Sequence, residues 1–169
     1  LKPVMRRSFL EAHGLAYDEK LRLGEDYDLY ARALLKGARY KVVHGCGYGA
    51  VVRADSLSGR HRTADLKRLY EADRAILALP GAGDRAEAAL RRHERHMRAR
   101  YELRRFLDVK AEQGLARAGL GALARPAALP AIVGGVAADK LDAFRARLSP
   151  ASAQPVLPRY LLAARAVQK

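Results

Sequence analysis

The stretch GEDYDLYARALLKG, residues 24–37, predicts an amphipathic helix that opens on three carboxylates. Leu29, Ala33 and the Leu34–Leu35 pair recur at helical spacing and predict the buried stripe, and Gly37 predicts the end. Acidic residues are favoured at a helix N-terminus, where unpaired N–H groups and the helix dipole offer positive charge. Three acids within four positions still need a reason, because the whole chain carries a formal net charge of +14.

Further elements are predicted on both sides of this helix. Apolar spacing and glycine stops predict three more helices, at Met5–His13, Ala64–Leu79 and Asp84–Gln113. Short runs rich in β-branched residues predict two strands, at Tyr40–Val43 and Tyr48–Arg53. Beyond Gly114 the chain is expected to form helical pieces separated at Pro126, Pro130, Gly134–Gly135 and Pro150.

This order of elements predicts an α/β class for the first part of the chain and helices alone for the rest. The break Pro80-Gly81-Ala82-Gly83 places the boundary, so that residues 1–80 form a mixed unit and residues 81–169 a basic helical extension. Residues 1–80 hold 15 Lys and Arg against 10 Asp and Glu, and residues 81–169 hold 17 against 8. The two net charges, +5 and +9, favour polyanionic partners such as nucleic acid, anionic lipid or phosphorylated substrates.

The chain contains one cysteine. Cys46 is the single cysteine, which excludes an internal disulfide and a cysteine-based metal cluster, and it favours a reducing, cytoplasmic location. Its neighbours form the run Gly45-Cys46-Gly47-Tyr48-Gly49, which lacks the helix start that phosphate-cradling loops require.

Several motifs in the first part resemble one known family. RRSFLEAHGL at residues 6–15, Tyr17-Asp18-Glu19 and GEDYDLY at residues 24–30 resemble the second half of a family 2 glycosyltransferase with the GT-A fold. The run from Val51 to His61 continues the match, which covers roughly residues 2–75 and is similar to bacterial succinoglycan-type glucosyltransferases. The resemblance implies that residues 1–80 are the acceptor-side, C-terminal half of a Rossmann-like domain. It also implies that the nucleotide-binding half is missing, so the chain alone is expected to be inactive.

The resemblance implies inverting transfer of a sugar from a nucleotide-sugar to a hydroxyl of a glycan or lipid-linked acceptor. In this family the second acid of the Glu-Asp pair is the general base, which is Asp26 here, while Glu25 would bind or orient the acceptor. A base of this kind must be ionised and within hydrogen-bond reach of the proton it removes. From the residue pattern alone, an acid-rich first helical turn explains the cluster equally simply. Asp28 is expected to be a surface or capping residue.

The resemblance also implies a divalent cation, Mg²⁺ or Mn²⁺, held mostly by residues absent from this chain. Asp26-Tyr27-Asp28 has the form of a metal-binding Asp-x-Asp, but it opens a helix instead of following the nucleotide-binding half, so we reject it as that motif. His61, with Arg60 and Arg53, is expected on the diphosphate side, and His61 is a candidate metal ligand. A solvated loop histidine and a surface ion pair are the alternative interpretations of these residues.

The remaining histidines, His13, His44, His93 and His96, lack evident partners and are expected at the surface. Arginines wrap most of the helix predicted at Asp84–Gln113 and leave a narrow apolar seam at Leu90, Met97 and Tyr101. A solvated helix on a catalytic domain is the simplest interpretation, and peripheral contact with anionic membrane at the inner face is the next. A basic nucleic-acid-binding protein and a non-catalytic remnant are the alternative functions, although no nucleic acid is expected.

Overall fold

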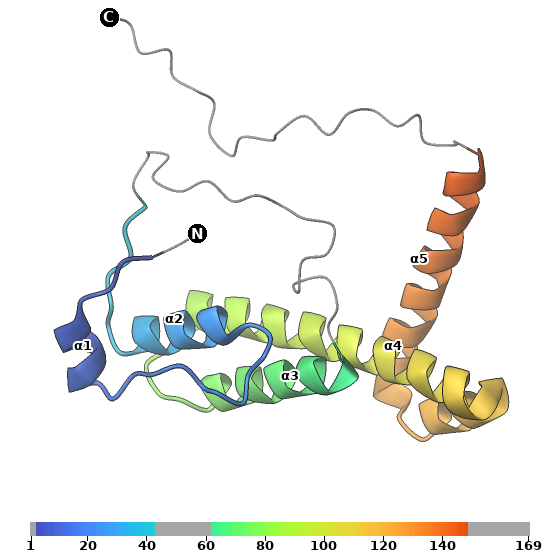
Figure 1. Cartoon of the computed structure of the whole chain (residues 1–169), viewed down its shortest axis with the longest axis horizontal. Helices are drawn as coiled ribbons and strands as arrows, with labels where there is room; N and C mark the ends of the chain where they lie inside the picture. The colour runs from blue at the N-terminus through green and yellow to red at the C-terminus, as the bar shows by residue number, and fades with distance from the viewer. Residues whose placement is uncertain (1–2, 43–61, 149–169) are drawn as a thin grey trace, which may run out of the picture.

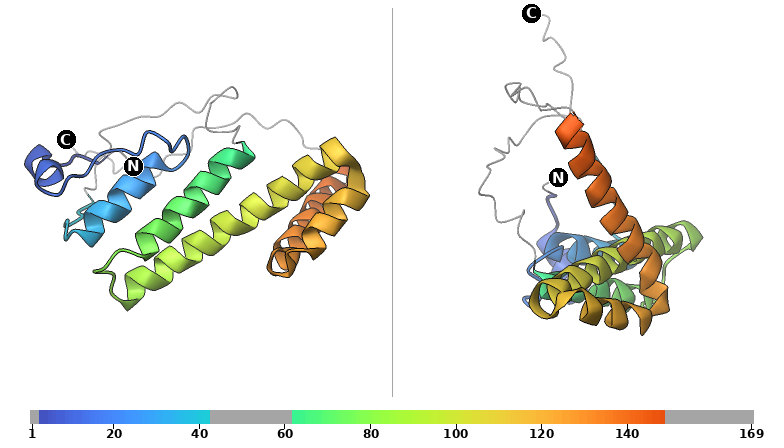
Figure 2. Two further views of the ribbon diagram at one scale, coloured as in Figure 1. Left: turned by 90° about the horizontal axis from the view of Figure 1, so that it is seen from below. Right: turned by 90° about the vertical axis from the view of Figure 1, so that its right-hand side faces the viewer.

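The computed structural model describes residues 3–42 and 62–148, and these residues form helices packed on helices (Figure 1). In chain order the elements are α1 (Arg7–Ala12), α2 (Glu25–Leu35), α3 (Thr63–Leu77), α4 (Asp84–Leu123), the short 3₁₀ helix η2 (Pro126–Ala128) and α5 (Leu129–Leu148). Helices α2, α3 and α4 lie side by side in one layer, and α5 rises away from its end (Figure 2).

Two small cores hold the helices together. Between α2, α3 and α4 the buried apolar side chains include Leu29, Leu66, Leu69, Ile76 and Met97. A second cluster, Ala122, Ala128 and Ile132, joins the end of α4 to η2 and α5, with Phe106 and Leu129 packed against it. Glu102 on α4 and Arg125 before η2 form an ion pair beside this second core.

The predicted α/β class is wrong, because the described residues contain helices and no strand. Tyr40 and Val42, at the start of the first expected strand, are 55% and 53% exposed and lie in irregular backbone. A strand is stable only when a neighbouring strand satisfies its backbone N–H and C=O groups, and in the described part of the chain the apolar stripes are buried by helix–helix packing instead. The rest of the expected strands, at residues 43 and 48–53, lies outside the described residues.

The helix predictions are confirmed to within a few residues at α1, α2 and α3. Within α4 the backbone leaves helical geometry at Gly114, with φ 83° and ψ 168°, so the expected helix end is present as a kink between two helical runs. The expected interruption at Gly134–Gly135 is absent, since α5 runs through both glycines. An added Cβ at Gly135 would overlap the Leu103 side chain of α4, which explains a glycine there as close helix packing.

The predicted boundary at Pro80-Gly81-Ala82-Gly83 falls in the turn between α3 and α4. These two helices pack along each other, so residues on both sides of the turn belong to one helical layer, and the division into two units stays a prediction. In the described ranges, no single helix is long and apolar enough to cross a membrane. By length and composition, only the bent pair Asp84–Leu123 and Pro126–Arg147, at 108°, passes that test.

Candidate functional site

The N-terminus of α2 is fixed by close packing against α3. Gly24 precedes the helix in the left-handed region, with φ 74°, and a Cβ at this position would lie 2.7 Å from a δ-carbon of Leu69. Leu69 is itself buried, at 4% exposed. Glycine is therefore required twice over, for its backbone conformation and for its lack of a side chain. The first residues of α2, Glu25 and Asp26, are held in place by this contact.

Asp26 lies within a small group of phenols. The Tyr17 hydroxyl donates a hydrogen bond to Asp26 Oδ1 at 3.1 Å, which connects the loop before α2 to its first turn. Tyr30 is one helical turn after Asp26, and burial together with the nearby Asp26 carboxylate and Tyr17 raises the pKa of the Tyr30 phenol to about 12. Glu25 and Asp26 are both half-buried, so the carboxylates are still reachable from solvent.

Asp28 has a structural role and does not lie at the surface as predicted. Its side chain is 8% exposed and accepts hydrogen bonds from Arg32 Nη2 at 2.6 Å and from Arg32 Nε at 2.9 Å. Arg32 also donates to the Ala16 carbonyl oxygen at 2.7 Å. The Asp28–Arg32 pair therefore ties α2 to the loop that carries Tyr17, and so supports the position of the Tyr17–Asp26 hydrogen bond.

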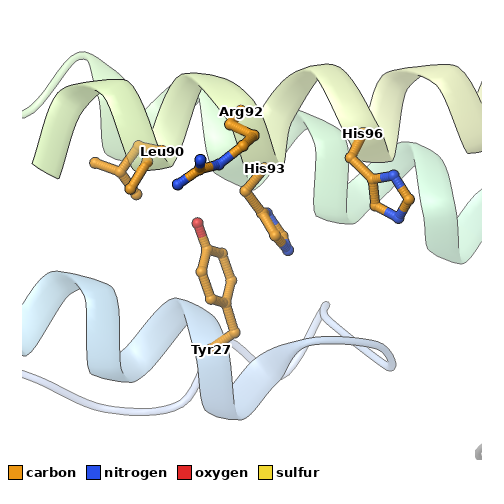
Figure 3. A pocket seen from close by; sticks show the side chains of 6 residues that line it. Tyr27, Leu90, Arg92, His93 and His96 are labelled. Carbon is orange, nitrogen blue, oxygen red and sulfur yellow. The ribbon is translucent and has the colours of Figure 1, made fainter. Parts of the chain in front are cut away.

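A buried polar cluster joins α2, α3 and α4 close to this site. Asp73 on α3 is 1% exposed, and both of its carboxylate oxygens lie within 3.0 Å of His93 Nδ1 on α4. The Tyr27 ring of α2 stacks on the His93 ring with centroids 4.1 Å apart. Figure 3 shows Tyr27 pointing from α2 toward α4, with its hydroxyl beneath Arg92 and its ring beside His93.

The electrostatics of this cluster are shifted by burial. Burial raises the pKa of the Asp73 carboxyl above its ordinary value, although the neighbouring His93 works in the opposite direction. Burial, followed by the charge and proximity of Asp73, raises the pKa of the Tyr27 phenol well above its usual range. The Tyr27 hydroxyl is buried and makes no hydrogen bond of ordinary geometry with the described residues. Such an unsatisfied group is uncommon in protein interiors and costs stability.

Sequence reasoning missed this cluster, although a signal for it exists. Asp73 continues the spacing of Leu66, Leu69 and Ile76 on α3, which places a carboxylate on the buried stripe of the helix. His93 falls in the same way between Leu90 and Met97 on α4. A polar residue on each of two buried stripes predicts that the two side chains pair, because buried polar groups need partners. The expectation that His93 is a surface residue without a partner is therefore wrong.

The other predicted site residues, His61, Arg60 and Arg53, lie outside the described residues, so their proximity to Asp26 stays a prediction. Asp26 and Tyr27 are neighbours in the chain but about 100° apart around the helix, so they serve different surroundings. Within residues 3–42 and 62–148, no group of three or more His, Asp or Glu side chains is placed to hold a metal ion. What this region offers chemically is a pair of accessible carboxylates at a helix start, Glu25 and Asp26, of which Asp26 accepts a hydrogen bond from Tyr17.

The chain is similar to two proteins of Rhizobium meliloti strain 1021. It is 69% identical over 151 residues to the succinoglycan biosynthesis protein ExoU, a match that covers 89% of this chain and 44% of that protein. It is 39% identical over 126 residues to the succinoglycan biosynthesis protein ExoO, covering 73% of this chain and 34% of that protein. No family model and no solved structure matches. The chain spans less than half the length of these relatives, whose names support a family of exopolysaccharide biosynthesis proteins.

Proposed function

We propose that this chain is part of an inverting family 2 glycosyltransferase that acts in exopolysaccharide biosynthesis. The observation that carries the proposal is the 69% identity to a succinoglycan biosynthesis protein over 89% of the chain. Building an exopolysaccharide requires the transfer of sugars to a growing glycan, which is the reaction that the family resemblance around Asp26 implies. Because the chain spans less than half of that relative, we expect the complete activity to need the rest of the protein.

In this proposal Asp26 is the general base. Its carboxylate takes the proton from the acceptor hydroxyl while that oxygen attacks the anomeric carbon, and the nucleoside diphosphate leaves with the electrons of the broken bond. Two features support the assignment: Asp26 is accessible, and it opens α2, where the helix dipole favours a negative charge. The Tyr17 hydroxyl, 3.1 Å from Oδ1, orients the carboxylate. Glu25, the preceding residue, is proposed to bind an acceptor hydroxyl.

The donor side of the reaction belongs to other residues. We propose that His61, Arg60 and Arg53 neutralise the diphosphate, with His61 as a candidate ligand of Mg²⁺ or Mn²⁺. Such a cation would stabilise the charge that develops on the leaving group.

The enzyme would act in the cytoplasm at the inner face of the membrane. The helices α4 and α5 expose Leu115, Leu120, Leu123 and Val133 in a chain of net charge +14, a combination suited to anionic lipid surfaces. Absence of co-sedimentation with anionic vesicles at low salt would contradict this membrane contact.

The assignment of Asp26 is tested in a protein that has the full length of the relatives, using Asp26→Asn. The substitution keeps an oxygen for the Tyr17 hydrogen bond but removes the basic group, so we expect transfer to fall by about 10²–10⁴-fold. Asp18→Asn is the matched control, because Asp18 is an exposed carboxylate of the preceding loop that caps the Lys20 N–H. We expect it to keep full activity. Sugar transfer to acceptor is measured with a radiolabelled donor, and circular dichroism confirms folding. Near-normal transfer by folded Asp26→Asn would refute the role of Asp26.

A further inference from the structure

A pocket of about 410 Å³ opens between α2 and α4. It is lined by Tyr27, Ala89, Leu90, Arg92, His93 and His96. Its walls are largely apolar, formed by the Tyr27 ring, Ala89 and Leu90, and its polar side chains come from one stretch of α4 (Figure 3). Small-molecule sites commonly combine apolar walls with a few convergent polar groups.

His93 is held in one orientation by its partner. Since a carboxylate only accepts hydrogen bonds, Nδ1 of His93 donates to Asp73, at 2.9 Å and 3.0 Å from its two oxygens. The stacked Tyr27 ring fixes the plane of the imidazole. This arrangement leaves Nε2 as the ring nitrogen that is free of Asp73. When the ring carries both protons, Nε2 is also a hydrogen-bond donor, and the contact with Asp73 leaves that nitrogen available to an anion.

The two other polar side chains of α4 that line the pocket, Arg92 and His96, are exposed. Arg92 is exposed and makes no ion pair with any described residue, whereas the adjacent Arg91 pairs with Glu87 at 2.5 Å. His96 is exposed one turn further along α4. No carboxylate lines the pocket among the described residues, so the Arg92 guanidinium is the charged group of the lining, and the imidazoles of His93 and His96 lie on the same stretch of α4.

We propose that this pocket binds a small organic oxyanion, with a phosphate or carboxylate held by Arg92 and the Nε2 of His93, and an apolar body against Tyr27 and Leu90. Arginine presents several N–H donors in a plane that matches an oxyanion, and hydrogen bonds between charged groups are stronger than neutral ones. The buried Asp73 acts from behind as a positioning residue. The site requires neither the general base Asp26 nor glycosyl transfer, so it stands independently of the proposed function.

The test uses the whole 169-residue chain and four probes: phenyl phosphate, benzoate, inorganic phosphate and benzyl alcohol. The ring proton signals of His93 and His96 are followed by NMR during titration at physiological salt. We expect saturable shifts with phenyl phosphate at a dissociation constant on the order of 1 mM. Benzoate should bind more weakly because it carries one charge instead of two, and inorganic phosphate more weakly because it lacks the apolar body. Benzyl alcohol, which has no charge, should cause no saturable shift.

Two substitutions at exposed positions, Arg92→Gln and His96→Gln, should weaken phenyl phosphate binding by about threefold to tenfold while thermal unfolding is unchanged. Arg100→Gln is the matched control, because it removes the same charge from α4 about 12 Å further along the helix, beyond the screening length of about 8 Å at physiological salt. Absence of saturable shifts with phenyl phosphate would overturn the proposal. An equal loss in Arg100→Gln and Arg92→Gln would also overturn it, since that result means diffuse attraction by a basic chain.

Discussion

Replacing Gly24 by alanine tests how the N-terminus of α2 is positioned. The new Cβ would lie 2.7 Å from one δ-carbon of Leu69, closer than such contacts come in proteins, and 3.0 Å from the other, which is also unusually tight. Leu69 is buried, so either its side chain or the start of α2 must shift. The backbone φ of 74° adds a second cost, because alanine disfavours the left-handed region.

The two costs can be estimated separately. Overpacking a filled core costs about 1–3 kcal/mol. An alanine in the left-handed region costs about 1–2 kcal/mol, of which the restriction of the unfolded chain returns about 0.4–1 kcal/mol. The free energy of unfolding should therefore fall by about 2–4 kcal/mol, which lowers the Tm by roughly 4–16 °C for a chain of this length. Urea unfolding followed by circular dichroism measures the free energy, and calorimetry measures the Tm.

Two other glycines separate these contributions. Gly14 has φ 59° and nothing within 4 Å of an added Cβ, so Gly14→Ala should show the backbone cost alone, about 1 kcal/mol. Gly83 has φ −75° and also has open space, so Gly83→Ala should change stability by less than about 0.5 kcal/mol. Leu69→Ala, added to Gly24→Ala, should cost less than it does in the natural sequence, because the overlap is removed. If Gly24→Ala is no worse than Gly14→Ala, the contact with Leu69 does not position α2.

Four further substitutions probe the buried cluster and α5. Tyr27→Phe removes a buried hydroxyl without a hydrogen-bond partner among the described residues, so unfolding free energy should stay level or rise by up to about 1–3 kcal/mol; a loss would mean that the hydroxyl is bonded to Asp73. Because the pKa of folded Asp73 is raised, the native state keeps the Asp73 proton to a higher pH than the unfolded chain does. Binding of this proton therefore stabilises the native state fully below the unfolded pKa, and the stabilisation is lost as the pH rises through the folded pKa. Relative to Asp73→Asn, the natural chain should therefore lose stability from about pH 4 upward, by at most about 1.4 kcal/mol per pH unit, in urea unfolding measured at several pH values; equal pH slopes would contradict the raised pKa. Gly134→Ala should stabilise α5 by up to about 1 kcal/mol because nothing lies within 4 Å, whereas Gly135→Ala should destabilise by about 1–3 kcal/mol against Leu103, and equal Tm values for the two variants would contradict the close packing.

Helices were predictable from this sequence because their signals are local. Apolar spacing and the glycine stops at Gly14, Gly37 and Gly114 identify where each helix lies and where it ends or kinks. Glycine, however, occurs in this chain for two different structural reasons. At Gly114 it supplies a positive φ and breaks the helix, whereas at Gly135 it lies inside a helix and permits a close approach of α4. Spacing within one segment cannot distinguish these cases, because the second depends on a neighbouring helix that is distant in sequence.

The candidate site was predictable only in part, for a related reason. The resemblance selected Asp26 among three acids, and its accessible position at the start of α2 is compatible with that choice. The burial of Asp28 depends on Arg32, one turn later, and on the Ala16 carbonyl of the preceding loop. The pairing of Asp73 with His93 joins two helices across a turn. Both arrangements bury a carboxylate. From the sequence alone a charged residue is expected at the surface, because its burial costs free energy unless a partner is present, and neither partner is evident before the fold is known.

The consecutive residues Asp26, Tyr27 and Asp28 lie in one helical turn, but their side chains contact different parts of the structure. Successive residues lie about 100° apart around a helix, so Asp26 faces the loop with Tyr17, Tyr27 faces α4, and Asp28 faces Arg32. Because all three are fixed to one short backbone segment, a shift of Tyr27 against His93 or of Gly24 against Leu69 must also move Asp26. Substitutions in the α3–α4 layer should therefore alter the site through geometry without touching it. If the proposed function holds, Gly24→Ala in a protein of the relatives' full length should reduce sugar transfer by more than its effect on folding explains.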